Sequence, residues 1–187
     1  GTTFGKAMLV LPAGSPASTG FPYILAQLVD TYHDIKFLAI IGMHCARLEG
    51  CEHTYQTWAQ GQGVLSSITP FLANSQALTL LGETSQTGIF TVGVSHTPVG
   101  LPQRHRQFCV ILVKLQGSHP AIAASHEVPD LAFTRAGLKP NEAGTMSAIG
   151  DLLKDGFPDI AIGFPAQNAI AIVSLAQQSD GELTATV

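Results

Sequence analysis

The residue types that can do chemistry are concentrated in two short polar segments, of which the first is a glycine- and hydroxyl-rich loop. Its candidate substrate-binding residues are Gly14, Ser15, Ser18, Thr19 and Gly20. Before a helix N-terminus, such a loop offers backbone N–H groups and the positive end of the helix dipole to an anion. Serine and threonine are also preferred helix N-cap residues, so an ordinary turn with a capped helix is the alternative.

The second segment combines two imidazoles with two thiols, at His44, Cys45, Cys51 and His53. Cysteine and histidine bind zinc in tetrahedral sites, but the spacing of these two cysteines matches no common zinc pattern, and we predict no metal. A cysteine with a histidine base can instead act as a nucleophile. Free cysteines are also often small buried hydrophobic residues. We retain His44, Cys45 and His53 as the candidate catalytic residues.

A third candidate set lies in the long polar stretch 95–106. His96 can act as a general base and Arg104 can clamp an anion, so both are added to the candidate substrate-binding residues. The alternative is a solvated loop histidine with no role. Farther along the chain, Asp151, Asp155 and Asp159 are predicted to be solvent-facing residues of a helix and a turn.

The first loop also resembles segments of two known families. Its Ser15-Pro16-Ala17-Ser18-Thr19-Gly20 run resembles the phosphate loop of flavodoxin-like proteins, and Pro12 to Thr19 is similar to a segment of formaldehyde-activating enzymes. The histidine that the second family carries on the preceding strand is absent, because Gly5 to Ala7 occupy that region. We assign the chain to neither family.

The elements that would position these loops are predicted to form a strand–helix–strand unit. Apolar runs at 6–11 and 35–42 flank a stretch from Pro22 to His33, in which Ile24, Leu25, Leu28 and Val29 recur at helical spacing. Two apolar runs joined by a helix are most simply parallel neighbours in a sheet buried on both faces. Both polar loops would then meet at the carboxyl edge of that sheet, where α/β proteins bind ligands.

The remaining chain is predicted to contain both further helices and further strands. Helices are expected at 54–73 and 140–154, and strands at 77–81, 88–94, 107–115, 131–134, 160–163, 169–175 and 182–187. Ser179-Asp180-Gly181 is a hairpin signal between the last two strands. The prediction is a single α/β domain over residues 1–187. It is three-layer-like, with a mixed sheet, an N-terminal parallel βαβ unit and antiparallel C-terminal strands.

Composition limits the class of partner. Only 12% of residues are charged, against about 25% in an average domain, which favours a covered surface and therefore a homo-oligomer. A net charge of −4 with nine scattered basic residues argues against nucleic acid. No apolar run reaches the length of a membrane span. Three cysteines cannot form a complete disulfide framework, so a reduced, cytoplasmic protein is expected.

These observations lead to two functional hypotheses. The first is an enzyme of small-molecule metabolism that acts on a phosphate- or carboxylate-bearing substrate at the carboxyl edge of the sheet, with an unknown cofactor. The second is a non-catalytic domain that binds a small ligand or serves as an oligomeric scaffold. The first is the leading hypothesis, because two polar, chemically capable loops are expected to meet at one edge of the sheet. The second is the alternative, which the low charge density and the absence of a strong catalytic motif support.

Overall fold

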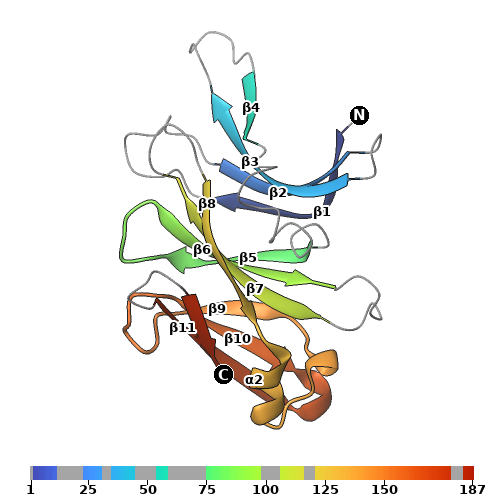
Figure 1. Ribbon diagram of the computed structural model, residues 1–187, viewed down its shortest axis with the longest axis vertical. Coiled ribbons are helices and arrows are strands. Elements are labelled where there is room, and N and C mark those ends of the chain that lie inside the picture. The colour runs from blue at the N-terminus through green and yellow to red at the C-terminus, as the bar shows by residue number, and fades with distance from the viewer. Residues whose placement is uncertain are drawn as a thin grey trace.

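The computed structural model describes residues 2–11, 23–30, 35–44, 54–58, 75–97, 106–115, 121–177 and 183–187. Within these ranges the chain forms three four-stranded sheets (Figure 1). The first contains β1 (Thr2–Leu11), β2 (Tyr23–Asp30), β3 (Ile35–His44) and β4 (Thr54–Trp58). The second contains β5 (Ser75–Glu83), β6 (Ile89–His96), β7 (Gln107–Lys114) and β8 (Ala121–Val128). The third contains β9 (Met146–Gly150), β10 (Asp159–Phe164), β11 (Ala169–Gln177) and β12 (Leu183–Thr186).

The three sheets are stacked in chain order, with the second sheet in the middle (Figure 1). Each sheet is a meander, because every strand pairs antiparallel with the next strand along the chain. The first strands of successive sheets are neighbours: β1 contacts β5, and β5 contacts β9. The last strands of the second and third sheets, β8 and β12, also contact each other.

The hydrophobic core is divided between the two interfaces of this stack. Between the first and second sheets lies a cluster that includes Leu11, Leu25, Val92, Val94 and Ile111. Between the second and third sheets lies a cluster that includes Phe108, Val110, Phe133, Ile160 and Phe164. Within the second cluster the ring of Phe133 lies 6.1 Å from that of Phe108 and 5.4 Å from that of Phe164.

The middle position of the second sheet explains the uninterrupted apolar run of β7. In β7, Cys109, Ile111 and Val113 join the first cluster, whereas the alternate residues Phe108 and Val110 join the second. Successive side chains of a strand point to opposite faces, so a strand covered on both faces needs apolar residues at every position. Such a run indicates two-sided burial, and it does so in this antiparallel sheet as well as in a parallel one.

The predicted α/β class with a parallel βαβ unit is wrong, and so is the three-layer arrangement built on it. The stretch expected as a helix is β2, which pairs antiparallel with β1 (Leu9 opposite Leu25) and with β3 (Leu25 opposite Ile40). Every strand pair of the described residues is antiparallel. Apolar residues on both faces of β2 produce a spacing that also fits a helix, and periodicity cannot separate the two for a short apolar run.

Most of the other predicted strands are confirmed, whereas the other predicted helices are not. Strands are found near 77–81, 88–94, 107–115, 160–163, 169–175 and 182–187, and the last two pair as an antiparallel hairpin. The predicted helices at 54–73 and 140–154 are wrong where the structure describes them, since β4 lies in the first and β9 in the second. The predicted strand 131–134 belongs to α2 (Asp130–Arg135), the one α-helix of the described ranges.

Two 3₁₀ turns complete the described chain, η1 (Pro140–Glu142) and η2 (Pro165–Gln167), each with a proline in its first turn. A proline suits that position because its missing N–H would have no partner within the helix. Among the helices that the structure describes, none is long and apolar enough to cross a membrane.

Candidate functional site

The two polar loops leave the first sheet at the same end. Leu11, the last residue of β1, pairs with Tyr23, the first of β2, and His44, the last of β3, pairs with Thr54, the first of β4. This common end follows from the antiparallel meander and not from the parallel unit that we expected. Of the residues predicted for these loops, Gly14, Ser15, Ser18, Thr19, Gly20, Cys45 and His53 lie outside the described residues, as does Arg104.

His96 lies in a strand and not in the loop where the sequence placed it. It is the last residue of β6, it pairs with Gln107 and Ser75, and its side chain is 1% exposed. In Figure 1, β1 and β5 run in the same direction across the stack. Because Ser75 begins β5 whereas Leu11 ends β1, His96 lies at the opposite end of the strands from Leu11. The structure therefore does not bring His96 together with the ends of the two polar loops.

The environment of His96 favours the neutral imidazole. Burial lowers its pKa below the ordinary value of 6.5, and the negative charge of Asp130 opposes that shift without cancelling it. Arg106, next to the predicted anion clamp, donates a hydrogen bond from Nη1 to the carbonyl oxygen of Gly144 at 3.1 Å. This guanidinium thus ties the start of β7 to the segment before β9.

Cys109 is the one cysteine that the structure describes, so the environment of a thiol can be examined only there. Cys109 is a free, buried thiol in β7. Burial and, secondarily, the charge of Glu127 raise its pKa to about 12, so it is not a reactive thiolate at neutral pH. Within the described ranges, no group of three or more His, Cys, Asp or Glu side chains is placed to hold a metal ion.

The three aspartates of the loop between β9 and β10 serve to organise that loop. Asp151 is exposed, and its two carboxylate oxygens accept the backbone N–H groups of Asp155 at 3.0 Å and of Gly156 at 2.9 Å. Asp155 is also exposed and accepts the N–H of Phe157 at 3.0 Å. Asp159, in contrast, is fully buried, so the expectation of three solvent-facing carboxylates fails at this residue.

The outward face of the third sheet is the most unusual surface among the described side chains. We define it by Ser147, Ala161, Gly163, Ile170 and Ile172, which register places on one side: Ala161 lies opposite both Ser147 and Ile172, and Gly163 opposite Ile170. The alternate residues Ala171, Val173 and Leu175 are buried against the second sheet. Ile170 is 70% exposed and Ile172 is 41% exposed. Sequence reasoning missed this face, because all of β11 reads as one apolar strand.

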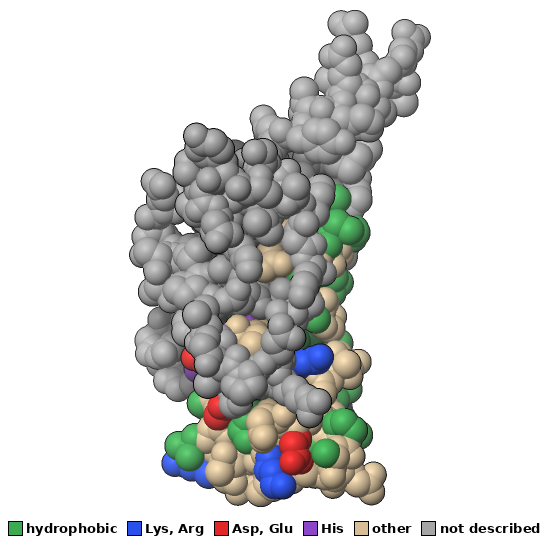
Figure 2. Space-filling view, turned by 90° about the vertical axis from the view of Figure 1, so that its right-hand side faces the viewer, with side chains coloured by type: hydrophobic (Ala, Val, Ile, Leu, Met, Phe, Trp, Pro, Cys, Tyr) green, Lys and Arg blue, Asp and Glu red, His purple; other side chains and the backbone are tan. Residues whose placement is uncertain are grey.

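The same face carries no charged side chain among the residues that the structure describes. Its further members on β11 are Ser174, which pairs with Thr186 of β12, and Ala176, which pairs with Thr184. The charged side chains visible in Figure 2 gather mainly toward the end of the molecule that carries α2 and η1. An uncharged sheet face with exposed isoleucines is typical of a contact surface and not of a surface that faces water.

A groove of about 460 Å³ adjoins this face at the end of β10. It is lined by Gly144, Thr145, Gly163, Phe164, Pro165, Asn168, Ala169 and Ile170. Gly144 and Gly163 bring two backbone segments close together: the N–H of Gly144 donates to the Gly163 carbonyl at 2.8 Å, and the N–H of Gly163 donates to the Thr145 carbonyl at 3.1 Å. A side chain at Gly144 would meet the Gly163 carbonyl oxygen at 3.2 Å.

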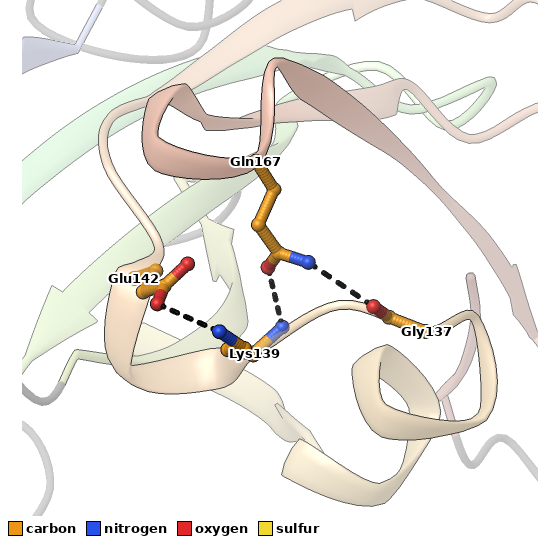
Figure 3. Close-up of polar contacts among 4 residues, drawn as sticks. All are labelled: Gly137, Lys139, Glu142 and Gln167. Carbon is orange, nitrogen blue, oxygen red and sulfur yellow. Dashed lines mark hydrogen bonds and ion pairs between the residues drawn. The ribbon is translucent and has the colours of Figure 1, made fainter.

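The connection that leads into β11 is fixed by Gln167 (Figure 3). Its Oε1 accepts the backbone N–H of Lys139 at 2.7 Å, and its Nε2 donates to the carbonyl oxygen of Gly137 at 3.1 Å. Lys139 also forms an exposed ion pair with Glu142, at 3.3 Å. Asn168 then turns the chain through a left-handed conformation (φ +50°) into β11. Gln167 therefore ties the start of β11, next to Ile170, to the segment between α2 and η1.

Neither the scan against protein-family models nor the search of the curated proteins finds a match for this chain.

Proposed function

We propose that this chain is a non-catalytic scaffold domain of the β-propeller type, which binds another protein through the outward face of its third sheet. Propellers arrange about four to eight four-stranded antiparallel sheets around a central axis. The contacts of β1 with β5 and of β5 with β9 support this class, because they gather the first strand of each sheet on one side of the stack.

The observation that carries the proposal is the exposure of Ile170 and Ile172 on a face without charge. Burying a side chain of this size stabilises a contact by about 1.5–3 kcal/mol, so the two isoleucines can act as anchors for a partner. The adjoining groove extends the surface beyond the edge of the sheet. The described residues contain no comparable set of reactive side chains, since His96 and Cys109 are both buried.

Site-specific photocrosslinking tests this function. A crosslinking amino acid at position 172 is expected to yield a defined adduct in the cells that make the protein, whereas the same group at Leu131 is not. Leu131 is a matched control, because it is 56% exposed and belongs to α2 and not to a strand of the third sheet. The partner identified in this way should bind the purified chain saturably and lose at least about tenfold in affinity with Ile170→Asp. Equal adducts from positions 172 and 131 would contradict the proposal.

A second candidate function is the enzyme acting on an anionic small molecule. It is favoured by one observation, the common end of the first sheet at which Leu11, Tyr23, His44 and Thr54 lie. Native mass spectrometry of the freshly purified protein tests it by detecting a retained phosphate- or carboxylate-bearing ligand. Turnover of such a ligand that survives both Cys45→Ser and Cys51→Ser would exclude thiol catalysis.

We also propose a cytoplasmic location, which rests on the odd number of cysteines and on the free thiol of Cys109. Thiol titration of the denatured, freshly purified protein is expected to count three free thiols. A count of one would indicate a disulfide and would contradict this location.

A further inference from the structure

The groove that adjoins the outward face of the third sheet opens where Gly163 of β10 has no side chain. Register places Gly163 opposite Ile170, one of the two exposed isoleucines of that face. Among the described residues, a Cβ atom added at Gly163 would meet the carbonyl oxygen of Thr145 alone, at 4.0 Å, so the space over this glycine is open. The floor of the groove at this point is therefore peptide backbone.

The lining of the groove combines apolar side chains with two polar ones. Pro165, Ala169 and Ile170 supply apolar surface, and Pro165 and Ile170 are exposed. Thr145 and Asn168 are also exposed, and their hydroxyl and amide groups can both donate and accept hydrogen bonds. None of the eight lining residues is charged. Such a lining suits a neutral occupant, because a charged group would lose its hydration there without gaining a counter-charge.

A positive charge lies next to the lining, on Arg106. Its Nη1 donates a hydrogen bond to the carbonyl oxygen of Gly144, which is a lining residue, at 3.1 Å. This charge disfavours a cationic occupant. It attracts the negative face of an aromatic ring, because the ring quadrupole interacts favourably with a guanidinium. An aromatic group thus satisfies both the uncharged lining and the charge beside it.

Hydrogen bonds hold the groove in shape without an occupant. The N–H of Gly144 donates to the Gly163 carbonyl at 2.8 Å, and the N–H of Asn168 donates to the Pro165 carbonyl at 3.2 Å. Gln167 fixes the turn between Pro165 and Asn168 through its two bonds to the segment after α2 (Figure 3). A site that is already ordered avoids the entropy cost of ordering on binding.

We propose that this groove receives a tyrosine or tryptophan side chain of the protein that binds the outward face of the third sheet. Its volume of about 460 Å³ accepts the largest side chains. The ring lies over the backbone of Gly163, which it can approach closely because no Cβ atom intervenes. Its hydroxyl or indole N–H bonds to Thr145 or Asn168, as the polar tips of buried tyrosine and tryptophan require. This inference rests on the proposed function, whose partner it describes.

The experiment titrates the full 187-residue chain with 4-methylphenol, the analogue of a tyrosine side chain, and follows backbone amide signals by NMR. Saturable shifts are expected at Gly144, Gly163 and Ile170. The matched control ligand is 4-methylcyclohexanol, which has the same size and a hydroxyl group but no aromatic ring, and it should bind at least about tenfold more weakly. Equal binding of the two compounds, or no saturable shift with 4-methylphenol, would overturn the proposal. This titration needs no variant.

Gly163→Val fills the groove from within the chain. The open space over Gly163 accepts the new side chain and valine suits a strand, so urea unfolding should show no loss of stability. Affinity for 4-methylphenol should nevertheless fall by at least about tenfold. Ala161→Val is the control, because Ala161 lies on the same face of β10 but does not line the groove. Unchanged affinity in Gly163→Val would overturn the proposal.

The partner captured by crosslinking provides the second arm of the test. Its affinity for the chain should fall by at least about tenfold with Gly163→Val and stay unchanged with Ala161→Val. If position 172 crosslinks to a defined partner that binds both variants equally well, this inference fails and the proposed function stands. If position 172 yields no defined adduct, the proposed function itself fails.

Discussion

Asp159 accepts a hydrogen bond from the backbone N–H of Leu152 at 2.7 Å, although the two residues stand at opposite ends of the loop between β9 and β10. The same oxygen, Oδ2, accepts the N–H of Leu153 at 3.2 Å. The carboxylate is fully buried at the start of β10, where Asp159 pairs with Gly150. One buried side chain thus closes the loop that joins two strands of the third sheet.

Replacing Asp159 with alanine is expected to destabilise the protein. The change leaves two backbone N–H groups without their acceptor, and each such loss costs roughly 1–3 kcal/mol where the group stays buried. Asp159→Asn retains an acceptor oxygen and should cost less. Urea unfolding followed by circular dichroism measures the difference in free energy. Asp155→Ala is the control, because Asp155 is exposed and accepts one N–H; an equal loss in that variant would contradict the role of Asp159.

A second prediction concerns the close approach of the second and third sheets at Gly93. A Cβ atom added at this position of β6 would lie 2.5 Å from Sδ and 2.6 Å from Cε of Met146, in β9. Gly93→Val must displace the flexible end of the Met146 side chain, so its cost through overpacking is expected at the lower end of the range, roughly 1 kcal/mol. Met146→Ala should recover part of that loss in the double variant, although alone it destabilises. Additive losses in a double-mutant cycle of urea unfolding would show that the two residues do not share this contact.

The strands of the second sheet were predictable, whereas the N-terminal unit was not. In β7, valine, isoleucine and phenylalanine fill both faces, and only a strand buried on two sides needs such a run. In β6 the large apolar residues lie on one face, and Thr91, Gly93 and Ser95 lie on the other. In β2 the apolar residues Ile24, Leu25, Leu28 and Val29 satisfy a helical spacing equally well. The segment forms a strand because it pairs with β1 and β3 in the first sheet. This tertiary pairing is not contained in a short window of the sequence.

The candidate face was beyond sequence reasoning for a related reason. In β11, Ile170 and Ile172 alternate with Ala171 and Val173, so both sets of side chains are apolar. The sequence marks the strand, but only the stack shows which set lies against the second sheet. For Asp159 the prediction was exposure, because an aspartate in a polar loop is usually exposed. Its burial depends on backbone N–H groups that only the folded loop brings together.

The burial of His96 makes stability depend on pH. Its pKa is lowered in the folded protein, so below the ordinary value of 6.5 the unfolded chain binds a proton that the folded protein does not. The stabilisation is therefore present above pH 6.5 and is lost as the pH falls toward the folded-state pKa. Urea unfolding between pH 8 and pH 5 should show a steeper loss for the unaltered chain than for His96→Gln. Since the two proteins differ only at position 96, the difference between them isolates His96; parallel curves would contradict the shift.

Cys109 should show the opposite dependence on pH. Because its pKa is about 12 in the folded protein, against an ordinary value of 9.0, its stabilisation is present below pH 9 and is lost as the pH rises toward 12.

In a Cys45→Ser, Cys51→Ser variant, Cys109 is the sole thiol. Its alkylation by iodoacetamide at pH 8 is then expected to be about 10³-fold slower in the folded than in the urea-unfolded chain, from the thiolate fraction alone. Burial against Ile111 and its neighbours slows the reaction further, because the reagent must reach the thiol through the interface between the first two sheets. Rapid alkylation of the folded chain, at a rate near that of the unfolded chain, would show that this interface opens readily and that Cys109 is not held in the core.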